Sequence, residues 1–289
     1  MAQQIPRLAV INSFAGFGKI SITAALPILS VMQVQACPLP TAVLSSHLAY
    51  SPCHKADFTE HMSNYLQAWS NIGVTFDGLY LGYMSNPTQL DIIRDLLDKH
   101  AAQDAASAPH SGLHILKPDA KIIIDPVMGD HGKAYSTVTS EQIEKMKQLV
   151  KRAHLITPNL TEICMLTDMS YHSDSWSDAE LAKMCSKLDP LHRMQIVITG
   201  IHTGEGFCNY LWDKGMTSSI TVPSAGASRP GTGDMFASIL SANALKGKNF
   251  AASVQQASDF IAACIRDSEA AGTPIKEGVL FEQNLSRLI

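Results

Sequence analysis

Three short segments of the 289-residue sequence combine carboxylates with glycines or helix-starting residues, a mixture that suits anion and metal binding. The most informative is Pro230-Gly231-Thr232-Gly233-Asp234, which runs directly into an apolar segment predicted to be helical. Two glycines let the backbone turn tightly and direct successive amide groups into one cavity. The helix N-terminus behind them adds about half a positive charge. The loop therefore suits a phosphate or a developing anion.

Asp234 falls in the first turn of that predicted helix, where two roles are open to it. It can simply cap the helix. It can instead be the base that takes a proton from a substrate hydroxyl, beside a loop that stabilises an anion.

A second segment, DPVMGD at 125–130, follows a run of β-branched residues. A carboxylate at the end of a buried strand is unfavourable unless it is paired or holds a cation. Asp125 and Asp130 would suit Mg²⁺, which binds a few carboxylates, several waters and substrate phosphates. The alternative is a turn with two solvated aspartates.

The third segment is TPNLTE at 157–162. Pro158 directs Thr157 into extended geometry. Asn159 can cap the following helix, and Glu162 three residues later completes a plausible capping box. The competing interpretation places Glu162 near a metal ion and its waters, with Asn159 near nucleotide phosphates.

The elements that must position these segments alternate along the chain between apolar strands and amphipathic helices. This alternation predicts an α/β fold with a mostly parallel sheet and helices on both faces. No break in composition and no internal repeat divides the chain, so we expect one domain over residues 1–289. The predicted strands are 7–13, 34–36, 41–46, 78–83, 121–124, 154–156 and 195–198, with a hairpin at 206–212 and 218–223.

The helical pattern is equally regular, with Pro27 expected to kink the first helix and Ser140 expected to cap a later one. Residues 103–118 are rich in Ala, Ser, His, Pro and Gly and are predicted to form a surface loop. The predicted helices are 20–32, 57–72, 88–100, 140–151, 233–245 and 250–270.

Nearly every predicted parallel strand ends in a polar or glycine-containing cluster. Ligands of open α/β sheets bind outside the carboxyl ends of the strands, so we expect these clusters to meet in one cleft. Polar residues also end strands without binding anything, and the pattern alone does not name a ligand. The clusters are Ser13, Ser45-Ser46-His47, Gly82-Tyr83, Asp125, Thr157-Pro158-Asn159 and Thr199-Gly200.

Composition excludes several other classes of protein. The formal charge is −4 and the basic residues are scattered, which gives no reason to expect nucleic acid or an anionic membrane as a partner. Six cysteines lie far apart without a Cys-x-x-Cys pair, which argues against a zinc site and suits a reducing cytosol. Arg7, Gly16, Gly18 and Lys19 interrupt the apolar N-terminal stretch, which argues against a signal peptide or a membrane span.

Taken together, the three segments resemble those of the ribokinase-like superfamily in its vitamin-kinase branch. Their order and spacing are similar to those of pyridoxal/pyridoxamine kinases, and the likeness covers essentially the whole chain. It looks closest to the pyridoxamine kinase-like proteins of Gram-positive bacteria. The resemblance implies a ribokinase-like three-layer α/β/α sandwich. Further matching segments are AGFGKIS near 15–21, CPLPTAVLSSH near 37–47, GY at 82–83 and KEGVLFE near 276–282.

The resemblance also implies roles for individual positions. Asp234 would be the catalytic base. The anion hole would be Gly231, Thr232 and Gly233. The Mg²⁺ and phosphate network would be Asp125, Asp130 and Glu162. The nucleotide contacts would be Thr157, Asn159 and Thr199, together with the glycines of the anion hole. The substrate contacts would be Ser13, His47, Tyr83 and Asp234.

Two features qualify these roles. A lone histidine such as His47 is more often packed or capping than a ligand contact. Many relatives carry a substrate-contacting threonine after this histidine, where this chain has Leu48, so vitamer preference stays open. Residues 128–138 resemble a mobile flap over the nucleotide site, and their composition is also typical of a mobile loop.

The implied reaction is ATP-dependent phosphorylation of the 5′-hydroxymethyl group of a B6 vitamer, with Mg²⁺ as the cofactor. Whether a monovalent cation such as K⁺ is also required is left open by the resemblance. A cytoplasmic homodimer is implied by the resemblance alone. The nearest alternative is a hydroxymethylpyrimidine (phosphate) kinase of thiamin biosynthesis, although no cysteine adjoins Asp234 as in some dual-specificity relatives. A non-catalytic ligand sensor is a third interpretation. A sugar kinase fits less well, because the N-terminal segment lacks a Gly-Gly-rich sugar-binding pattern and a lid sheet.

Overall fold

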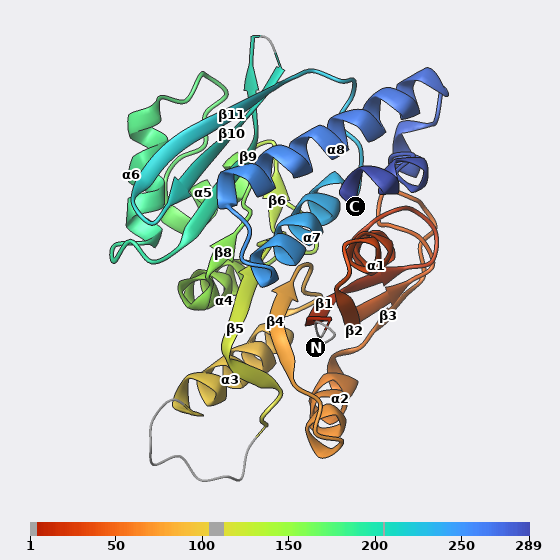
Figure 1. Ribbon diagram of the computed structural model, residues 1–289, viewed down its shortest axis with the longest axis vertical. Coiled ribbons are helices and arrows are strands. Elements are labelled where there is room, and N and C mark those ends of the chain that lie inside the picture. The colour runs from red at the N-terminus through yellow and green to blue at the C-terminus, as the bar shows by residue number, and fades with distance from the viewer. Residues whose placement is uncertain (1–4, 104–112, 205) are drawn as a thin grey trace.

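The computed structural model describes residues 5–103, 113–204 and 206–289 (Figure 1). Within these ranges one large sheet has the strand order β11-β10-β9-β8-β5-β4-β1-β2-β3. Antiparallel strands flank its parallel centre on both sides, with β3 (Lys55–Asp57) at one edge and the hairpin β10 (Gly206–Asp213) and β11 (Met216–Pro223) at the other. The parallel strands are β1 (Arg7–Ala15), β2 (Gln35–Leu44), β4 (Phe76–Leu81), β5 (Leu116–Ile124), β8 (Leu155–Ile156) and β9 (Gln195–Thr203).

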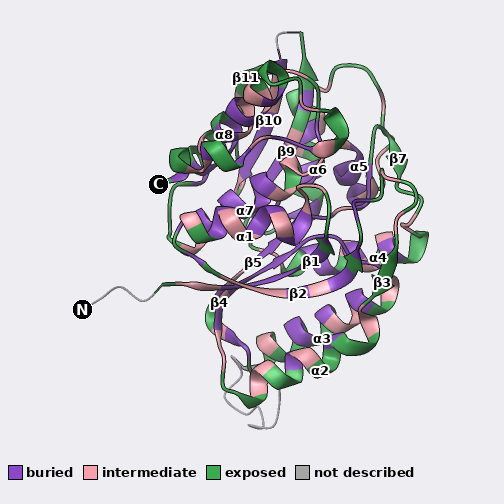
Figure 2. Cartoon of the chain, turned by 90° about the vertical axis from the view of Figure 1, so that its right-hand side faces the viewer, coloured by how far each residue is buried: buried purple, intermediate pink, exposed green. Residues whose placement is uncertain are grey.

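Helices cover both faces of the sheet, which confirms the predicted three-layer α/β/α architecture (Figures 1 and 2). One face packs against α1 (Ser21–Val31), α7 (Thr232–Leu245) and α8 (Phe250–Ala270). The other face packs against α2 (Thr59–Asn71), α3 (Pro87–Gln103), α4 (Ser140–Leu149), α5 (Leu160–Thr167) and α6 (Asp178–Leu188).

The alternation of side chains along the central strands explains the two cores. In β4, Leu79 and Leu81 point into the core on the α2–α6 side, whereas Tyr80 between them points towards α7. Because both faces are covered, these strands are apolar on both sides and lack the alternating polar residues of a half-exposed sheet. Figure 2 shows the buried strands between helices whose outer sides, for example those of α2 and α3, are exposed.

The sequence predicted two separate strands in place of β2, with Pro38 and Pro40 between them, and the structure differs. The strand β2 is continuous through both prolines, paired with β1 from Gln35 to Leu44. On its other side, β3 pairs only with residues 42–44, so no strand of the described ranges pairs with the edge beside both prolines. Prolines two residues apart present their missing N–H groups to the same side, and this open edge tolerates them.

Smaller differences have local causes. The strand β5 begins at Leu116, within the predicted 103–118 loop, of which residues 104–112 lie outside the described ranges. The cap of α4 is Thr139 and not Ser140, because the Thr139 side chain accepts from the Gln142 amide and completes a capping box. Elements not predicted are β3, α6 and the small hairpin of β6 (Gly129–Asp130) with β7 (Lys133–Ala134).

The remaining predicted helices match the structure to within a few residues, and α1 does contain Pro27. After α8, the chain ends in two short 3₁₀ turns, Ile275–Glu277 and Glu282–Leu288. None of the helices in the described ranges combines the length and apolar character that a membrane span requires.

Candidate active site

A cavity of about 920 Å³ lies at the carboxyl ends of the parallel strands, and the three segments identified in the sequence all line it. The segments come from the ends of β5 and β8 and from the start of α7, so the fold brings together parts of the chain about a hundred residues apart. Every residue predicted for the site borders this cavity: Ser13, His47, Tyr83, Asp125, Asp130, Thr157, Asn159, Glu162, Thr199, Gly231, Thr232, Gly233 and Asp234.

The anion loop (residues 230–233) forms the start of α7. Gly231 is the N-cap, with φ of 87°, and a Cβ atom there would lie 1.9 Å from the Lys19 carbonyl oxygen. Only glycine fits this close approach in a left-handed conformation. The first amides of α7 have no acceptor within the helix and lie at the positive end of its dipole. Because the loop lines the cavity, these amides are available to an anion bound there.

Asp234 is half-buried in the first turn of α7 and does not serve as its N-cap, which is Gly231. Its Oδ1 accepts a hydrogen bond of 3.0 Å from Asn12 Nδ2. Burial raises the pKa of the Asp234 carboxyl, while hydrogen bonds from the Ser21 amide and from Asn12 act to lower that pKa. A carboxylate held in this way, in a cavity beside an anion site, is suited to accept a proton.

Asn12 is a central residue of the site that the sequence analysis missed. It is fully buried in the second half of β1, and its Oδ1 accepts from the amides of Ser13 at 2.8 Å and Tyr83 at 3.0 Å. Its Nδ2 donates to Asp234, so one side chain joins β1, the end of β4 and α7. The available signal was an amide side chain at the end of an apolar strand run, next to Ser13, where a buried polar group requires partners.

Asp125 lies at the end of β5, is only 8% exposed, and accepts a hydrogen bond of 2.8 Å from Thr157 Oγ1. It faces the anion loop, because a Cβ atom on Gly233 would stand 4.0 Å from Asp125 Oδ2. Burial and the negative charge of Asp234 raise the pKa of Asp125 to about 7, against the lowering effect of Thr157. The carboxylates of Asp125 and Asp234 thus lie close enough to repel each other, and a cation between them would stabilise this arrangement.

Glu162 has the capping role that its spacing predicted. Its Oε2 accepts from the Asn159 amide at 2.9 Å, and Asn159 Oδ1 accepts from the Glu162 amide at 2.9 Å. Its Oε1 accepts from the Met128 amide at 3.1 Å, which ties the start of α5 to the segment after β5. Burial, followed by the charge of Asp125, raises the pKa of Glu162 well above its usual value. Glu162 still borders the cavity, with both oxygens engaged by backbone amides.

Asp130 lies on the exposed hairpin of β6 and β7, and its Oδ1 accepts from the His131 amide at 2.8 Å. Within the ranges that the structure describes, no three His, Cys, Asp or Glu side chains lie close enough to hold a metal ion by themselves. Asp125, Asp130 and Glu162 therefore form no closed metal cage. Mg²⁺ is usually held by one or two carboxylates together with waters and substrate phosphates, a mode that needs no closed cage.

The positions expected at the nucleotide side lie next to one another. Thr199 forms an isolated parallel bridge with Asn159, and its amide donates to the Pro158 carbonyl at 2.9 Å. This bridge extends the pairing of β8 and β9 beyond the two-residue β8. Asn159 Nδ2 also donates to the Gly129 carbonyl at 2.8 Å, so the same residue holds the hairpin.

The positions expected at the substrate side have mixed geometry. Ser13 is buried, with its Oγ 2.9 Å from Ser21 Oγ. The Tyr83 hydroxyl is buried and has no hydrogen-bond partner among the described residues. His47 uses both ring nitrogens within the protein, since Nδ1 accepts from the Ala49 amide and Nε2 lies 2.6 Å from the Lys276 carbonyl. With Nδ1 as an acceptor, Nε2 is assigned the proton, and His47 anchors a loop at the cavity wall.

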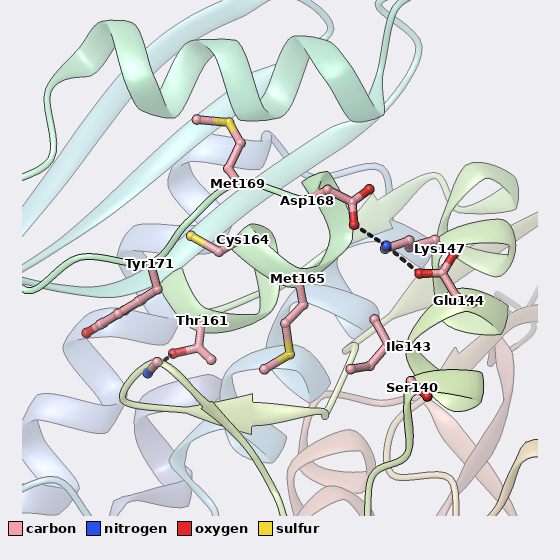
Figure 3. A pocket seen from close by; sticks show the side chains of 11 residues that line it. Ser140, Ile143, Glu144, Lys147, Thr161, Cys164, Met165, Asp168, Met169 and Tyr171 are labelled. Carbon is pink, nitrogen blue, oxygen red and sulfur yellow. Dashed lines mark hydrogen bonds and ion pairs between the residues drawn. The ribbon is translucent and has the colours of Figure 1, made fainter.

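A smaller cavity of about 350 Å³ lies behind the hairpin, between α4 and α5 (Figure 3). Figure 3 shows Lys147 between Glu144 and Asp168, with an ion pair to each. On the hairpin side, Thr161 Oγ1 accepts from the Gly132 amide at 2.8 Å. This contact attaches the hairpin to the start of α5.

The sequence of the chain matches the family model described as phosphomethylpyrimidine kinase over residues 110–278, which is more than half of its length. The chain belongs to this family. A curated relative assigned as a pyridoxal kinase, from Schizosaccharomyces pombe, is 27% identical over 81% of this chain and 66% of its own length. The hydroxymethylpyrimidine/phosphomethylpyrimidine kinase of Bacillus subtilis is 29% identical over 53% of this chain and 56% of its own length. The matched part of the chain thus spans between half and two thirds of the length of these relatives.

Solved structures agree with the family and cover the whole fold. A protein of Bacteroides thetaiotaomicron, assigned as a phosphomethylpyrimidine kinase, is 32% identical with a TM-score of 0.89, covering 100% of this chain and 95% of that one. Its orthorhombic crystal form, with pyridoxal, has a TM-score of 0.87 and covers 99% and 96% of the two chains. Pyridoxal kinase from Lactobacillus plantarum, at 22% identity and a TM-score of 0.86 over 99% and 97% of the two chains, shows the fold alone. The predicted resemblance is confirmed at the level of family and fold.

Proposed function

We propose that this chain is a vitamin kinase that transfers the γ-phosphoryl group of ATP to the 5′-hydroxymethyl group of a B6 vitamer, releasing ADP. The observation that carries the proposal is the meeting of Asp234, the anion loop and Asp125 in one cavity. A base, a set of amide donors and a cation-binding carboxylate at one point are the parts that in-line phosphoryl transfer requires. A ligand sensor would need no base beside the anion loop.

In this mechanism Asp234 takes the proton of the attacking hydroxyl, and Asn12 holds its carboxylate in a fixed orientation. The amides of the anion loop stabilise charge on the transferring group. Asp125 fits a magnesium ion, because its carboxyl is buried beside Asp234 and forms no ion pair among the described residues. Asp125 would hold that ion directly, and Glu162 would contact its waters. The ion would supply charge neutralisation at the ATP phosphates.

The choice of a B6 vitamer over hydroxymethylpyrimidine rests on two observations. The relative at 32% identity was crystallised with pyridoxal, and this chain carries Asp234 with Met235 and no cysteine at the end of the anion loop. The family model and the Bacillus subtilis relative favour hydroxymethylpyrimidine kinase as the second candidate. Both substrates are flat heteroaromatic rings that carry a hydroxymethyl group.

A substrate panel tests the proposal. Purified protein with MgATP is assayed for ADP release with pyridoxal, pyridoxine, pyridoxamine and hydroxymethylpyrimidine, each over a range of concentrations. We expect the highest kcat/KM with a B6 vitamer. Turnover of hydroxymethylpyrimidine alone would establish the second candidate, and binding of a ring compound without ADP release would establish a sensor.

Further properties are proposals of the same kind. We expect residues 1–289 to act as one domain, in the cytoplasm and as a homodimer, and we expect residues 128–138 to move over bound nucleotide. Repeating the assay with Na⁺ or K⁺ as the monovalent cation measures any requirement for K⁺. Light scattering of the purified chain measures its oligomeric state.

A further inference from the structure

The C-terminal strap (residues 273–282) contains the segment KEGVLFE, to which the proposed function gives no role. The strap contacts two cavity loops through specific bonds. Its Lys276 carbonyl accepts from His47, 2.6 Å away, and Glu282 forms an ion pair of 2.8 Å with Lys19. The 3₁₀ turn that begins at Glu282 packs against α1 and α8, so the strap enters the site from the α8 side of the sheet (Figure 1).

The strap also touches the anion loop through its backbone. Gly278 has φ of 82°, and a Cβ atom there would lie 3.1 Å from the Pro230 carbonyl oxygen and 3.4 Å from Lys19 Cβ. On the other side of the contact, Gly231 has no room for a Cβ atom against the Lys19 carbonyl. The backbones of three segments therefore approach one another closely, so a shift of the strap would be felt by the anion loop.

Arg229, directly before the anion loop, clamps this contact. Its side chain is only 2% exposed, and Nη2 pairs with Glu269 Oε1 at 3.0 Å on the solvent side. Its Nη1 donates to three carbonyl oxygens of the strap: Thr273 at 2.9 Å, Pro274 at 3.3 Å and Gly278 at 3.1 Å.

The charge of Arg229 is essential to this arrangement. Three carbonyl oxygens that converge on one buried point repel one another unless a cation lies between them. The guanidinium is always ionised, and its fixed fork of donors can satisfy several acceptors at once. Among the described residues that line the main cavity, Arg229 is the only lysine or arginine. Thr232 Oγ1 donates to the Arg229 carbonyl at 3.0 Å, so the clamp continues into the anion loop.

We propose that Arg229 is a positioning residue for phosphoryl transfer, which acts by locking the C-terminal strap against the anion loop. In this mechanism Arg229 contacts neither ATP nor the ring substrate, and it acts by fixing the position of the amides of residues 231–233. The kinetic part of this inference rests on the proposed function. The structural part, the locking of two segments by one buried guanidinium, does not.

Kinetics of Arg229→Ala and Arg229→Lys test the inference. Misplacement of catalytic groups by about 1 Å can cost on the order of a hundredfold, so we expect kcat of Arg229→Ala to fall about tenfold to a hundredfold. The KM of the ring substrate should change less than kcat, because only one of its expected contacts, His47, is bonded to the strap, whereas Ser13 and Tyr83 lie on other segments. Lysine keeps the charge without the fork and should retain an intermediate kcat. Millimolar guanidinium ion should restore part of the activity of Arg229→Ala and none of that of Arg229→Lys.

Two controls separate positioning from loss of stability. Asp189→Asn changes another buried polar side chain that joins two segments on the α6 side of the molecule. Asp189 follows α6 and accepts from Trp212 Nε1 of β10 at 2.9 Å and from the Met194 amide, just before β9, at 3.0 Å. This substitution should lower the melting temperature and leave kcat unchanged. Gly278→Ala keeps Arg229 but pushes the strap from Pro230, and should lower kcat as Arg229→Ala does. Wild-type kcat in both Arg229→Ala and Gly278→Ala would overturn the proposal, as would a kcat loss in Asp189→Asn equal to theirs.

Hydrogen exchange of the ligand-free protein gives a readout that does not depend on activity. In Arg229→Ala, the amides of 273–282 and of 229–235 should exchange faster together, at least about tenfold, while those of α6 keep the wild-type rate. Unchanged exchange in both segments would overturn the locking claim. Absence of phosphate transfer by the wild-type chain to every ring substrate would refute the proposed function and leave this exchange test standing.

Discussion

The two walls of the cavity are built in different ways. The base wall carries Asn12, Asp234 and the anion loop. Its side-chain hydrogen bonds join segments that are far apart in the sequence, 222 residues in the case of Asn12 and Asp234. The hairpin wall (residues 129–138) is mostly exposed. It is attached through backbone groups, at Gly132 to Thr161 and at Gly129 to Asn159.

This difference between the two walls corresponds to their different roles in the proposed reaction. The proton acceptor and the amide donors must keep a fixed geometry, because small displacements of reacting groups are costly. A segment that covers the nucleotide must open for ADP to leave, and segments that move are drawn from the less stable parts of a protein. Substitutions in the base wall should therefore change kcat, and substitutions at the hairpin should change nucleotide affinity.

The largest effect is expected at the centre of the base wall. Asp234→Asn keeps the shape of the side chain and removes its ability to accept a proton. We expect kcat to fall at least about a hundredfold, the usual contribution of a general base, with little change in the KM of ATP. Steady-state ADP release measures both constants. Near-wild-type turnover would refute the assignment of the base.

Asn12→Asp tests whether the base is tuned by its buried neighbour. The new side chain can still accept from the Ser13 and Tyr83 amides, but it places a second carboxyl against Asp234. A like charge raises the pKa of Asp234, so a smaller fraction is in the proton-accepting form at neutral pH. We expect the acid limb of kcat/KM to move up by about one pH unit, with activity recovering at higher pH. A pH profile that does not move would show that Asn12 has no part in tuning the base.

Asp125→Asn should separate stability from activity. In the protein without metal or nucleotide, the pKa of Asp125 is raised from its ordinary value to about 7. The stability that its protonated form contributes is complete below about pH 4 and is lost as the pH rises through 7. At pH 8 the amide variant should therefore be more stable than the wild type, by about 2 kcal/mol or more, and much less active. Urea unfolding at pH 5 and pH 8 measures the difference, which should shrink at pH 5; an equal effect at both pH values would contradict the expectation.

The smallest effect is expected at the hairpin wall. Thr161→Val removes the acceptor of the Gly132 amide and leaves the base wall untouched. We expect the KM of ATP to rise about threefold, in line with the loss of one hydrogen bond, while kcat stays within about twofold. Ser140→Ala, at the other side of the same small cavity (Figure 3), is the matched control and should change neither constant. A large fall of kcat in Thr161→Val would remove the distinction between the two walls.

Much of the fold was predictable because its elements carry strong local signals. Apolar runs with helical segments between them indicated the parallel sheet, and α8 was predicted with its observed bounds. The capping box of Asn159 and Glu162 was recognised from a spacing of three residues. Errors occurred where a neighbouring strand decides the structure. Pro38 and Pro40 are tolerated in β2 because, within the part of the chain that the structure describes, no strand pairs with the edge beside them.

The sequence by itself determined the chemical inventory of this protein, namely a glycine-rich anion loop followed by Asp234 and two acidic segments at strand ends. Only the tertiary structure decided how those groups are held. It showed that Asn12 orients Asp234, that the Met128 amide donates to Glu162, and that Arg229 joins the C-terminal strap to the anion loop. The physical reason is that composition and short spacings encode which groups are present, whereas hydrogen bonds between segments more than thirty residues apart depend on how the sheet and its covering helices pack.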